Sequence, residues 1–331
     1  LYVHARVAGG WVLEQRLDVF DALAPQTGTS AFADRWAVAG ETIFARYRDG
    51  GLQGAPHRVA VFERVAGVWQ KTQTLDADPA FFVPGTFGAT LAADGDALVV
   101  GSYDAVAFQG FATGVIETFA PDAQGVWSRV DLTTGSNVDA GDRGLAALRG
   151  DHFAVVSNGE LVVHERIPTG WTVQHTLPVG PLEAGPTPQT AAGLALTDGR
   201  VVLGGDVGAM AYVFDVTAPS GLPMLQEIAA DEFPARDING PFAALVAAEG
   251  DLLAIGVRAD LEGQPTIRFF EWYDGRYRAF ESLRAGAGVD AVALGGGRAL
   301  LAAPWSDPGA LVPADARLEV RRLDGARAVP Y

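Results

Sequence analysis

Side chains that could carry chemistry are spread thinly along the chain, and none falls into a catalytic or metal-binding spacing. The histidines stand far apart, with no pair spaced to hold a metal ion; they are His4, His57, His152, His164 and His175. A nucleophile elbow, a phosphate loop and a nucleotide fingerprint are all missing from the sequence. We therefore expect no catalytic, cofactor-binding or metal-ligating residue, and we favour a protein that is not an enzyme.

Carboxylates are the one abundant reactive group, with 40 aspartates and glutamates in the chain. Two carboxylates that face one another across a groove can hydrolyse a glycosidic bond. Sequence spacing alone cannot pair residues from different strands. A carbohydrate-active enzyme or a lectin therefore remains the alternative to a binding module.

The sharpest short motif is Arg149-Gly150-Asp151, which matches a tripeptide used in cell adhesion. The similar tripeptides Asp94-Gly95-Asp96 and Glu249-Gly250-Asp251 stand between apolar runs elsewhere in the chain, and such residues are typical of a tight turn. A turn therefore explains the motif as well as adhesion does. Arg149, Gly150 and Asp151 are candidate binding residues on the adhesion interpretation.

Three tryptophans lie outside the repeated positions described below: Trp36, Trp272 and Trp305. An aromatic ring with a polar edge suits contact with a protein or a sugar. Trp36 and Trp305 both stand beside apolar runs that could bury them, and Trp305 also begins a long loop within Pro304-Trp305-Ser306-Asp307-Pro308. We predict all three as candidate binding residues.

The overall composition of the 331-residue chain excludes several classes of protein. A net charge of −16 and a pI of about 4.6 leave no basic face for phosphate contacts, which argues against a nucleic-acid partner. The absence of cysteine excludes disulfides and thiolate metal sites. No apolar run reaches the roughly 18 residues that cross a bilayer, so no transmembrane segment is expected.

The stretch from Phe87 to Leu132 predicts a four-stranded antiparallel sheet. An apolar run breaks at Asp94-Gly95 and a β-branched run follows at once, which indicates a tight hairpin. Two further β-rich runs, around Ile116 and Trp127, are separated by a turn rich in Pro, Asp and Gly.

Two markers of this unit repeat along the chain at intervals of about 50 residues. One is an aromatic residue or histidine seven residues before a second aromatic, as in Phe62 and Trp69. The other is a glycine hinge between apolar runs, which suits a primed hairpin turn with positive φ; the hinges are Gly40, Gly95, Gly150, Gly199, Gly250 and Gly296. Continuous apolar runs after the hinges, such as Leu98-Val99-Val100, indicate strands buried on both faces.

This pattern predicts an all-β fold, a β-propeller of four-stranded antiparallel blades in a single domain over residues 1–331. The expected repeats are residues 1–20 (partial), 30–77, 86–134, 143–180, 190–230, 241–285 and 288–331. Residues 1–20 supply only an outer hairpin. We expect seven blades, with an inner hairpin preceding Leu1; six blades are the alternative.

The unit at Phe87-Gly88-Ala89 and Leu91 to Gly101 resembles the bacterial FG-GAP repeat, and Phe119 with Gly125-Val126-Trp127 matches its second half. The other units match more loosely. Related repeats build the seven-bladed propeller of integrin α subunits and occur in many exported bacterial proteins. The resemblance implies a bacterial extracytoplasmic module, secreted, periplasmic or on the cell surface. It would serve protein binding, adhesion or scaffolding, and its partner would be a protein or cell-surface component, with carbohydrate as the alternative.

The chain departs from integrin-type repeats at their calcium loop, which resembles Asp-x-Asp-x-Asp-Gly. Here Asp94 and Asp96 flank a hairpin glycine, and Asp139 and Asp142 stand apart. Calcium takes about six to eight oxygen ligands, so two carboxylates on a tight turn are too few. We expect no bound cofactor.

Overall fold

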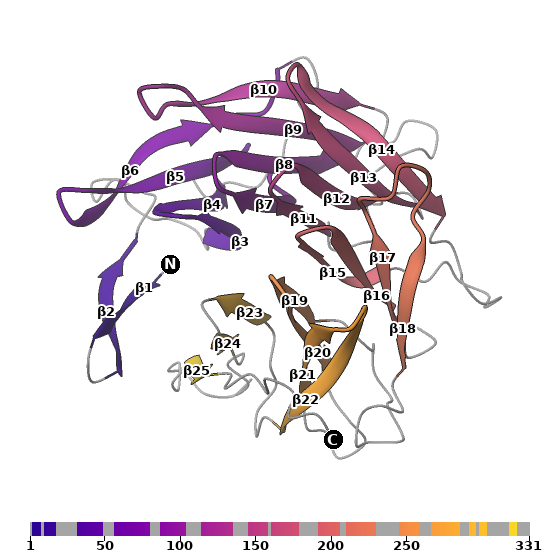
Figure 1. The fold of residues 1–331 in the computed structure, drawn as a ribbon. Coiled ribbons are helices and arrows are strands. Elements are labelled where there is room, and N and C mark those ends of the chain that lie inside the picture. The colour runs from indigo at the N-terminus through magenta and orange to yellow at the C-terminus, as the bar shows by residue number, and fades with distance from the viewer. Residues whose placement is uncertain are drawn as a thin grey trace. The chain divides into compact units, whose positions relative to one another are not determined.

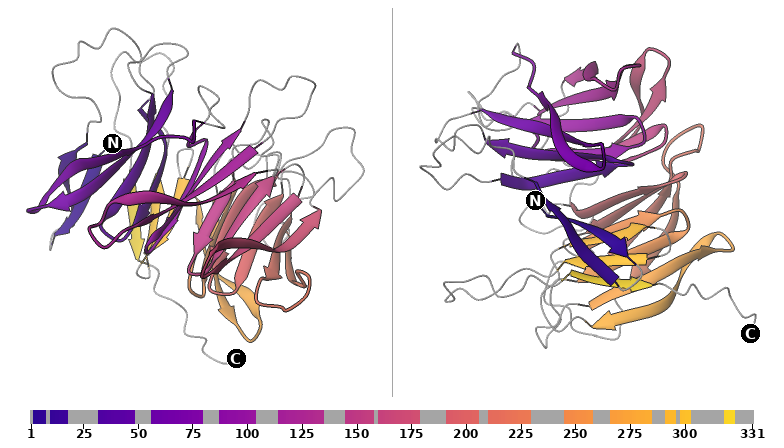
Figure 2. Two further views of the ribbon diagram at one scale, coloured as in Figure 1. Left: turned by 90° about the horizontal axis from the view of Figure 1, so that it is seen from above. Right: turned by 90° about the vertical axis from the view of Figure 1, so that its left-hand side faces the viewer.

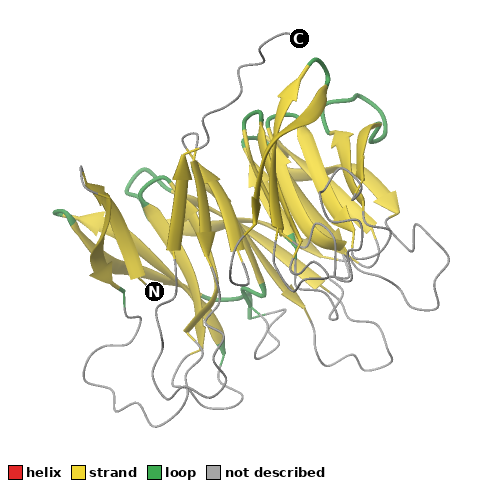
Figure 3. Ribbon diagram, turned by 90° about the horizontal axis from the view of Figure 1, so that it is seen from below, coloured by secondary structure: helices red, strands yellow, loops and turns green. Residues whose placement is uncertain are grey.

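Every regular element that the structure describes is a β-strand, as the computed structural model shows (Figure 3). The structure describes residues 2–7, 10–17, 32–48, 56–79, 87–103, 114–134, 145–157, 160–178, 191–205, 210–229, 245–257, 266–284, 291–295, 298–302 and 318–322. The prediction of an all-β chain is confirmed. In these ranges no helix is long and apolar enough to span a membrane.

The described strands form seven antiparallel sheets, in which consecutive strands pair with one another (Figures 1 and 2). One sheet has two strands: β1 (Tyr2–Val7) and β2 (Gly10–Arg16). Five sheets have four strands each. The first two of these are β3 (Phe32–Ala39), β4 (Thr42–Arg48), β5 (His57–Val65) and β6 (Val68–Leu75), then β7 (Thr90–Asp94), β8 (Ala97–Tyr103), β9 (Gly114–Pro121) and β10 (Trp127–Thr134).

The remaining sheets follow the same order. The other four-stranded sheets are β11 (Ala146–Arg149), β12 (His152–Ser157), β13 (Glu160–Ile167) and β14 (Gly170–Pro178); β15 (Ala191–Thr197), β16 (Arg200–Gly205), β17 (Met210–Asp215) and β18 (Met224–Ala229); and β19 (Leu245–Glu249), β20 (Leu252–Val257), β21 (Thr266–Tyr273) and β22 (Arg276–Arg284). The three-stranded sheet holds β23 (Ala291–Gly295), β24 (Arg298–Ala302) and β25 (Leu318–Arg322).

The chain divides into two compact units. Unit 1 comprises Leu1–Asp151 and Arg166–Thr172, and unit 2 comprises His152–Glu165 and Val173–Tyr331, so the division passes through the sheet of β11 to β14. The expectation of a single domain stays a prediction.

Within each unit an inner strand of one sheet, the first or in one case the second, contacts the first strand of the next sheet. In unit 1, β3 contacts β7 and β7 contacts β11. In unit 2, β12 contacts β15, β15 contacts β19, and β19 contacts β23. Four-stranded antiparallel sheets packed in chain order through their inner strands are the blades of a β-propeller, which confirms the predicted fold class. The count of seven blades stays a prediction.

The glycine hinges form the turn between the first and second strands of each blade. Gly40, Gly95, Gly150, Gly199 and Gly250 all have positive φ, between +54° and +85°. A Cβ atom is strained in that region, which explains why glycine recurs there. The sixth hinge, Gly296, lies outside the described residues.

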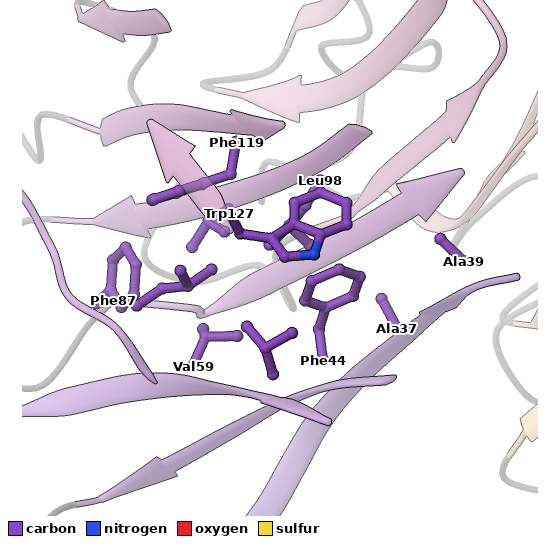
Figure 4. Packing of buried hydrophobic residues seen from close by; sticks show 11 residues of the cluster. Ala37, Ala39, Phe44, Val59, Phe87, Leu98, Phe119 and Trp127 are labelled. Carbon is purple, nitrogen blue, oxygen red and sulfur yellow. The ribbon is translucent and has the colours of Figure 1, made fainter. Parts of the chain in front are cut away.

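The core between β3–β6 and β7–β10 forms one apolar cluster (Figure 4). The second strand β8 is buried on both faces, since Leu98, Val99 and Val100 are each at most 1% exposed. Trp127 packs edge-on against Phe44, with 4.7 Å between ring centroids, so it joins the two blades. The marker aromatics are therefore packing residues here, as Phe119 and Trp127 share this cluster.

The paired marker aromatics do not stand directly opposite one another across their hairpin. Trp69 faces Arg64 in the register of β5 and β6, and Phe62 faces Lys71. The pair is offset by two residues in an unbroken register, because the register shift of this hairpin lies between Val61 and Phe62. Phe62 and Trp69 still pack in the same apolar cluster.

Candidate binding surface

The predicted tryptophans have different surroundings. Trp36 on β3 has an exposed fraction of 49%, so its ring is accessible. Trp272 on β21 is half-buried, and its ring meets that of Tyr277 edge-on at 4.9 Å. Trp305 lies outside the described residues. Of the two tryptophans that the structure describes, Trp36 and Trp272, the accessible one is therefore Trp36.

The tripeptide Arg149-Gly150-Asp151 forms the turn after β11 and contacts the preceding blade within unit 1. The Gly150 N–H donates to Asp94 Oδ2 at 2.7 Å, and Arg149 Nη1 lies 3.8 Å from Asp94 Oδ1. The Asp151 carbonyl accepts from the Arg166 N–H at 2.8 Å. All three residues thus hold internal contacts. An adhesive role for them stays a prediction.

Arg166, which also belongs to unit 1, completes this joint between two blades. Its guanidinium donates to both carboxylate oxygens of Asp96, at 2.8 and 3.3 Å, and lies over the ring of Trp171 at 6.0 Å. Hydrogen bonding by Arg166 lowers the pKa of Asp96 from its ordinary value, and the same bond raises the pKa of Arg166. We call the contacts of Asp94, Asp96, Arg149 and Arg166 the ionic joint.

Unit 2 has an equivalent joint built from other residues. Arg200, next to the hinge Gly199, donates to the Gly250 carbonyl at 3.1 Å and to Asp251 Oδ1 at 3.0 Å. Its guanidinium lies 4.2 Å from the ring centroid of Trp272 and 5.5 Å from that of Tyr277. Burial is the main cause that raises the pKa of Tyr277, and nearby Arg200 opposes it. We call this set the cation–π joint.

A second kind of link between blades was missed from the sequence. A glutamine on the fourth strand of one blade brackets the backbone of the marker aromatic in the next. Gln73 accepts from the Trp127 N–H at 2.8 Å and donates to the Trp127 carbonyl at 2.5 Å. The pairs Gln15 with Trp69 and Gln226 with Tyr277 have the same two hydrogen bonds.

A sequence signal for these glutamine clamps exists. Gln15 and Gln73 each stand four residues after a marker tryptophan, Trp11 and Trp69. Asp131 occupies that position after Trp127, and its Oδ2 accepts a hydrogen bond from the Trp171 N–H at 2.8 Å. This spacing could have predicted the clamps of Gln15 and Gln73, but not that of Gln226, since Leu222 stands four residues before it.

The Phe-Gly start of the resemblance has a physical cause. Phe87 is 2% exposed and meets Phe119 edge-on at 6.4 Å. Gly88 has a φ of +74°, and a Cβ there would lie 3.2 Å from the Arg46 side chain. Arg46 itself donates from Nε to the Phe87 carbonyl at 3.0 Å. The burial of the Phe87 ring and the left-handed conformation of Gly88 beside the Arg46 side chain therefore explain why this dipeptide occurs here.

One buried carboxylate lies in the middle of a blade. Glu117 on β9 is 1% exposed; it accepts from Arg129 Nη1 at 2.7 Å and from the Asp78 N–H at 3.3 Å. Burial raises the pKa of Glu117 despite the Arg129 bond. Arg129 Nη1 also lies 3.2 Å from Asp78 Oδ2. These groups satisfy one another, so we interpret them as structural.

Exposed apolar side chains recur at the tips of the outer hairpins, where the third strand turns into the fourth. In unit 1 they belong to three successive hairpins: Val65 (44% exposed), Val68 (50%), Val126 (50%) and Ile167 (38%). Tyr273, at the equivalent turn of unit 2, is 52% exposed. We call the unit 1 set the valine tips. In the part of the chain that the structure describes, no three His, Asp or Glu residues gather to hold a metal ion.

Comparisons with known proteins show the fold alone. No protein-family model matches the chain, and no curated protein matches it. A solved protein from Lactobacillus plantarum matches with 16% identity and a TM-score of 0.51, over 86% of this chain and 84% of the other. Hsv2 from Kluyveromyces lactis (10% identity, TM-score 0.49, 90% and 76% covered) and BamB from Moraxella catarrhalis (10%, 0.45, 81% and 68%) resemble it less.

Proposed function

We propose that this chain is an FG-GAP-like propeller that acts as a bacterial extracytoplasmic module for binding or scaffolding a protein partner. The observation that carries the proposal is the series of valine tips. A single exposed valine needs no explanation, because most protein surfaces carry some. An exposed aliphatic residue at the same turn of three successive hairpins is different, because it offers a partner one contact per blade.

The internal contacts of the polar motifs also support a binding role for the tips. The charged groups of the ionic joint and the glutamine clamps are used between blades, where they hold adjacent sheets in register. The Phe87-Gly88 packing gives the FG-GAP resemblance a structural role in blade assembly. The extracytoplasmic location follows from that resemblance and is part of the proposal.

The experiment compares capture of partner proteins by the wild-type chain and by a tip variant. The variant carries Val65→Lys, Val68→Lys and Val126→Lys; these side chains are exposed, so folding should survive, as checked by thermal melting. The matched control carries Gln70→Lys and Ser128→Lys, exposed polar positions on β6 and β10 that lie two residues after Val68 and Val126. Each protein is immobilised and offered the exported proteins of a bacterium that encodes it, and bound proteins are quantified by mass spectrometry.

We expect a specific partner to be retained by the wild type and the control. The tip variant should bind it at least about tenfold more weakly, which corresponds to about 1.4 kcal/mol. Equal retention by all three proteins would contradict a role of the tips. Saturable binding to a glycan array, unaffected by the tip changes, would favour the lectin alternative.

A further inference from the structure

The hairpin of β17 and β18 ends in the longest of the described outer tips (Figure 1). Residues 216–223 join these two strands, whereas the other described outer tips span residues 66–67, 122–126, 168–169 and 274–275. The whole hairpin belongs to unit 2. Its blade has no marker aromatic, since Leu222 stands four residues before the clamp residue Gln226. This blade therefore has a long tip in place of the usual short turn and aromatic.

Hydrogen bonds and burial fix the base of this tip. The Asp215 N–H donates to the Pro223 carbonyl at 3.0 Å, which closes the loop. Asp215 Oδ1 accepts from the Thr217 N–H at 2.8 Å and from the Thr217 hydroxyl at 2.6 Å, as in an Asx turn. Val216 is 0% exposed, and its N–H donates to the Gly199 carbonyl at 3.0 Å. The tip is thus constrained before any partner binds, which lowers the entropy cost of binding.

Beyond this base the tip is exposed and apolar. Pro219 and Pro223 are exposed, and Met224 and Leu225, the first residues of β18, are 51% and 40% exposed. Residues 216–225 hold no charged, amide or aromatic side chain, although the chain as a whole has a net charge of −16. We call residues 216–225 the neutral tip. Prolines limit its backbone freedom, and methionine adapts its shape to an apolar partner surface.

The composition of the neutral tip narrows the kind of partner that it fits. Phosphate groups of a nucleic acid or an anionic lipid are bound by Lys and Arg, and anchoring in a membrane interface uses Trp and Tyr. Contact with a sugar calls for an aromatic ring with a polar edge. The neutral tip has none of these side chains. An apolar protein surface is the partner that its side chains suit, and because the tip ends a hairpin, that surface is concave.

We propose that the neutral tip docks into an uncharged, apolar groove of a partner protein, with Met224 and Leu225 as its apolar contacts. Charge complementarity supports this choice, because burying a neutral tip against a neutral groove leaves no charge unpaired. The contact goes beyond the binding role of the valine tips, which belong to unit 1, and does not depend on it.

The test first maps the contact and then measures it. The photocrosslinker p-benzoylphenylalanine is placed at Ser220, an exposed residue of the neutral tip. The protein is offered the exported proteins of a bacterium that encodes it, together with phosphatidylethanolamine vesicles, and mass spectrometry locates the crosslinked residues. The crosslinked protein is then purified and titrated at low and high salt.

The titration compares the wild type with two tip-directed variants. One carries Pro219→Ser and Met224→Ser, which removes apolar surface, and the other carries Met224→Glu, which adds a charge. Thr176→Glu, an exposed change on β14 in the same unit, is the matched control. The variant with lysines at the valine tips is titrated as well, and thermal melting checks that every variant is folded.

We expect crosslinks to an uncharged groove of one protein and binding at least about tenfold weaker in both tip-directed variants. The Kd of the wild type should change less than about twofold between low and high salt, because no ion pair is involved. Thr176→Glu and the valine-tip variant should bind as the wild type does.

Crosslinks only to lipid, only to a second copy or to no protein would each overturn the proposal. Equal binding by the wild type and both tip-directed variants, or a strong salt dependence, would overturn it too. Loss of binding in the valine-tip variant alone would assign the partner to the valine tips, which supports the proposed function and contradicts this inference.

Discussion

The ionic joint and the cation–π joint connect successive blades at the same place with different chemistry. In each, the residue two positions after the marker residue of the third strand donates its N–H to the aspartate of the hinge turn: Arg166 to Asp151 at 2.8 Å, and Trp272 to Asp251 at 2.7 Å. The partner side chain stands just after the hinge glycine of the preceding blade, as Asp96 in one joint and Arg200 in the other.

The difference lies in how far each contact is removed from water. The Asp96 side chain is 65% exposed and that of Arg166 34%, whereas the side chain of Arg200 is only 12% exposed. An exposed ion pair is screened by water and salt, while a guanidinium stacked on aromatic rings keeps its packing. The same backbone arrangement therefore supports two kinds of contact between blades: a salt-sensitive one in the ionic joint and a salt-resistant one in the cation–π joint.

The largest expected effect is a difference in the free-energy cost of removing the aromatic ring next to each joint, Tyr277 or Trp171. Tyr277→Ala removes a side chain that is 2% exposed and should cost about 3–5 kcal/mol of the free energy of unfolding. Trp171→Ala, at the equivalent position beneath the ionic joint, should cost about 2 kcal/mol or less, because that ring is half-buried. Urea unfolding of both variants measures this; equal costs would remove the distinction in burial.

The second largest expected effect is a difference in the stability cost of removing the two arginines, Arg200 and Arg166. Arg200→Ala should cost about 2 kcal/mol, since it removes aromatic packing and hydrogen bonds to the Gly250 carbonyl and Asp251. Arg166→Ala should cost about 0.2–1 kcal/mol, as expected for an exposed ion pair. The loss at Arg166 should shrink in high salt while the loss at Arg200 persists. Melting curves at low and high ionic strength check this, and the same salt response at both sites would contradict it.

Acid should weaken the ionic joint. The pKa of Asp96 is lowered from 3.8 by the hydrogen bond from Arg166, so the folded chain binds a proton there less readily than the unfolded chain. The joint's stabilisation is therefore complete above the ordinary pKa and is lost as pH falls through the lower pKa of the folded state.

The measurement is the difference in melting temperature between the wild type and Asp96→Asn, at pH 7 and at about pH 3. The wild type should be more stable at neutral pH, and the two should converge in acid. Ser128→Ala, an exposed change, should follow the wild type at both values. A difference that persists unchanged in acid would show that Asp96 acts through packing.

The smallest expected effect is a conversion of one joint into the other. Asp96→Arg together with Arg166→Trp places the Arg200–Trp272 pair in unit 1. The single change Asp96→Arg sets two cations against each other, whereas the double variant should return to within about 0.5 kcal/mol of the wild type. A double-mutant cycle from urea unfolding gives the coupling, and a coupling near zero would mean that the two joints are not interchangeable.

Local constraints were readable from the sequence. A primed turn needs positive φ, which favours glycine. The turns could therefore be predicted from the sequence at Gly40, Gly95, Gly150, Gly199 and Gly250, and so could the strands on either side of them. Continuous apolar runs such as Leu98-Val99-Val100 indicated strands buried on both faces. Each of these depends on a few neighbouring residues and on the alternation of side chains along a strand.

The contacts of candidate site residues were not readable in this way. The sequence could not show that Arg149 lies near Asp94, that Trp272 lies under Arg200, or that Trp36 stays exposed.

The sequence by itself determined the repeat, the strand class and the turns of this protein, because those follow from φ preferences and side-chain periodicity over short stretches. Only the tertiary structure decided how blades are joined, since residues some 50 positions apart meet there and burial decides whether a charge pairs or stacks. The clamps of Gln15 and Gln73 belong to both levels: their spacing from a marker tryptophan is visible in the sequence, and their partners lie in the next blade.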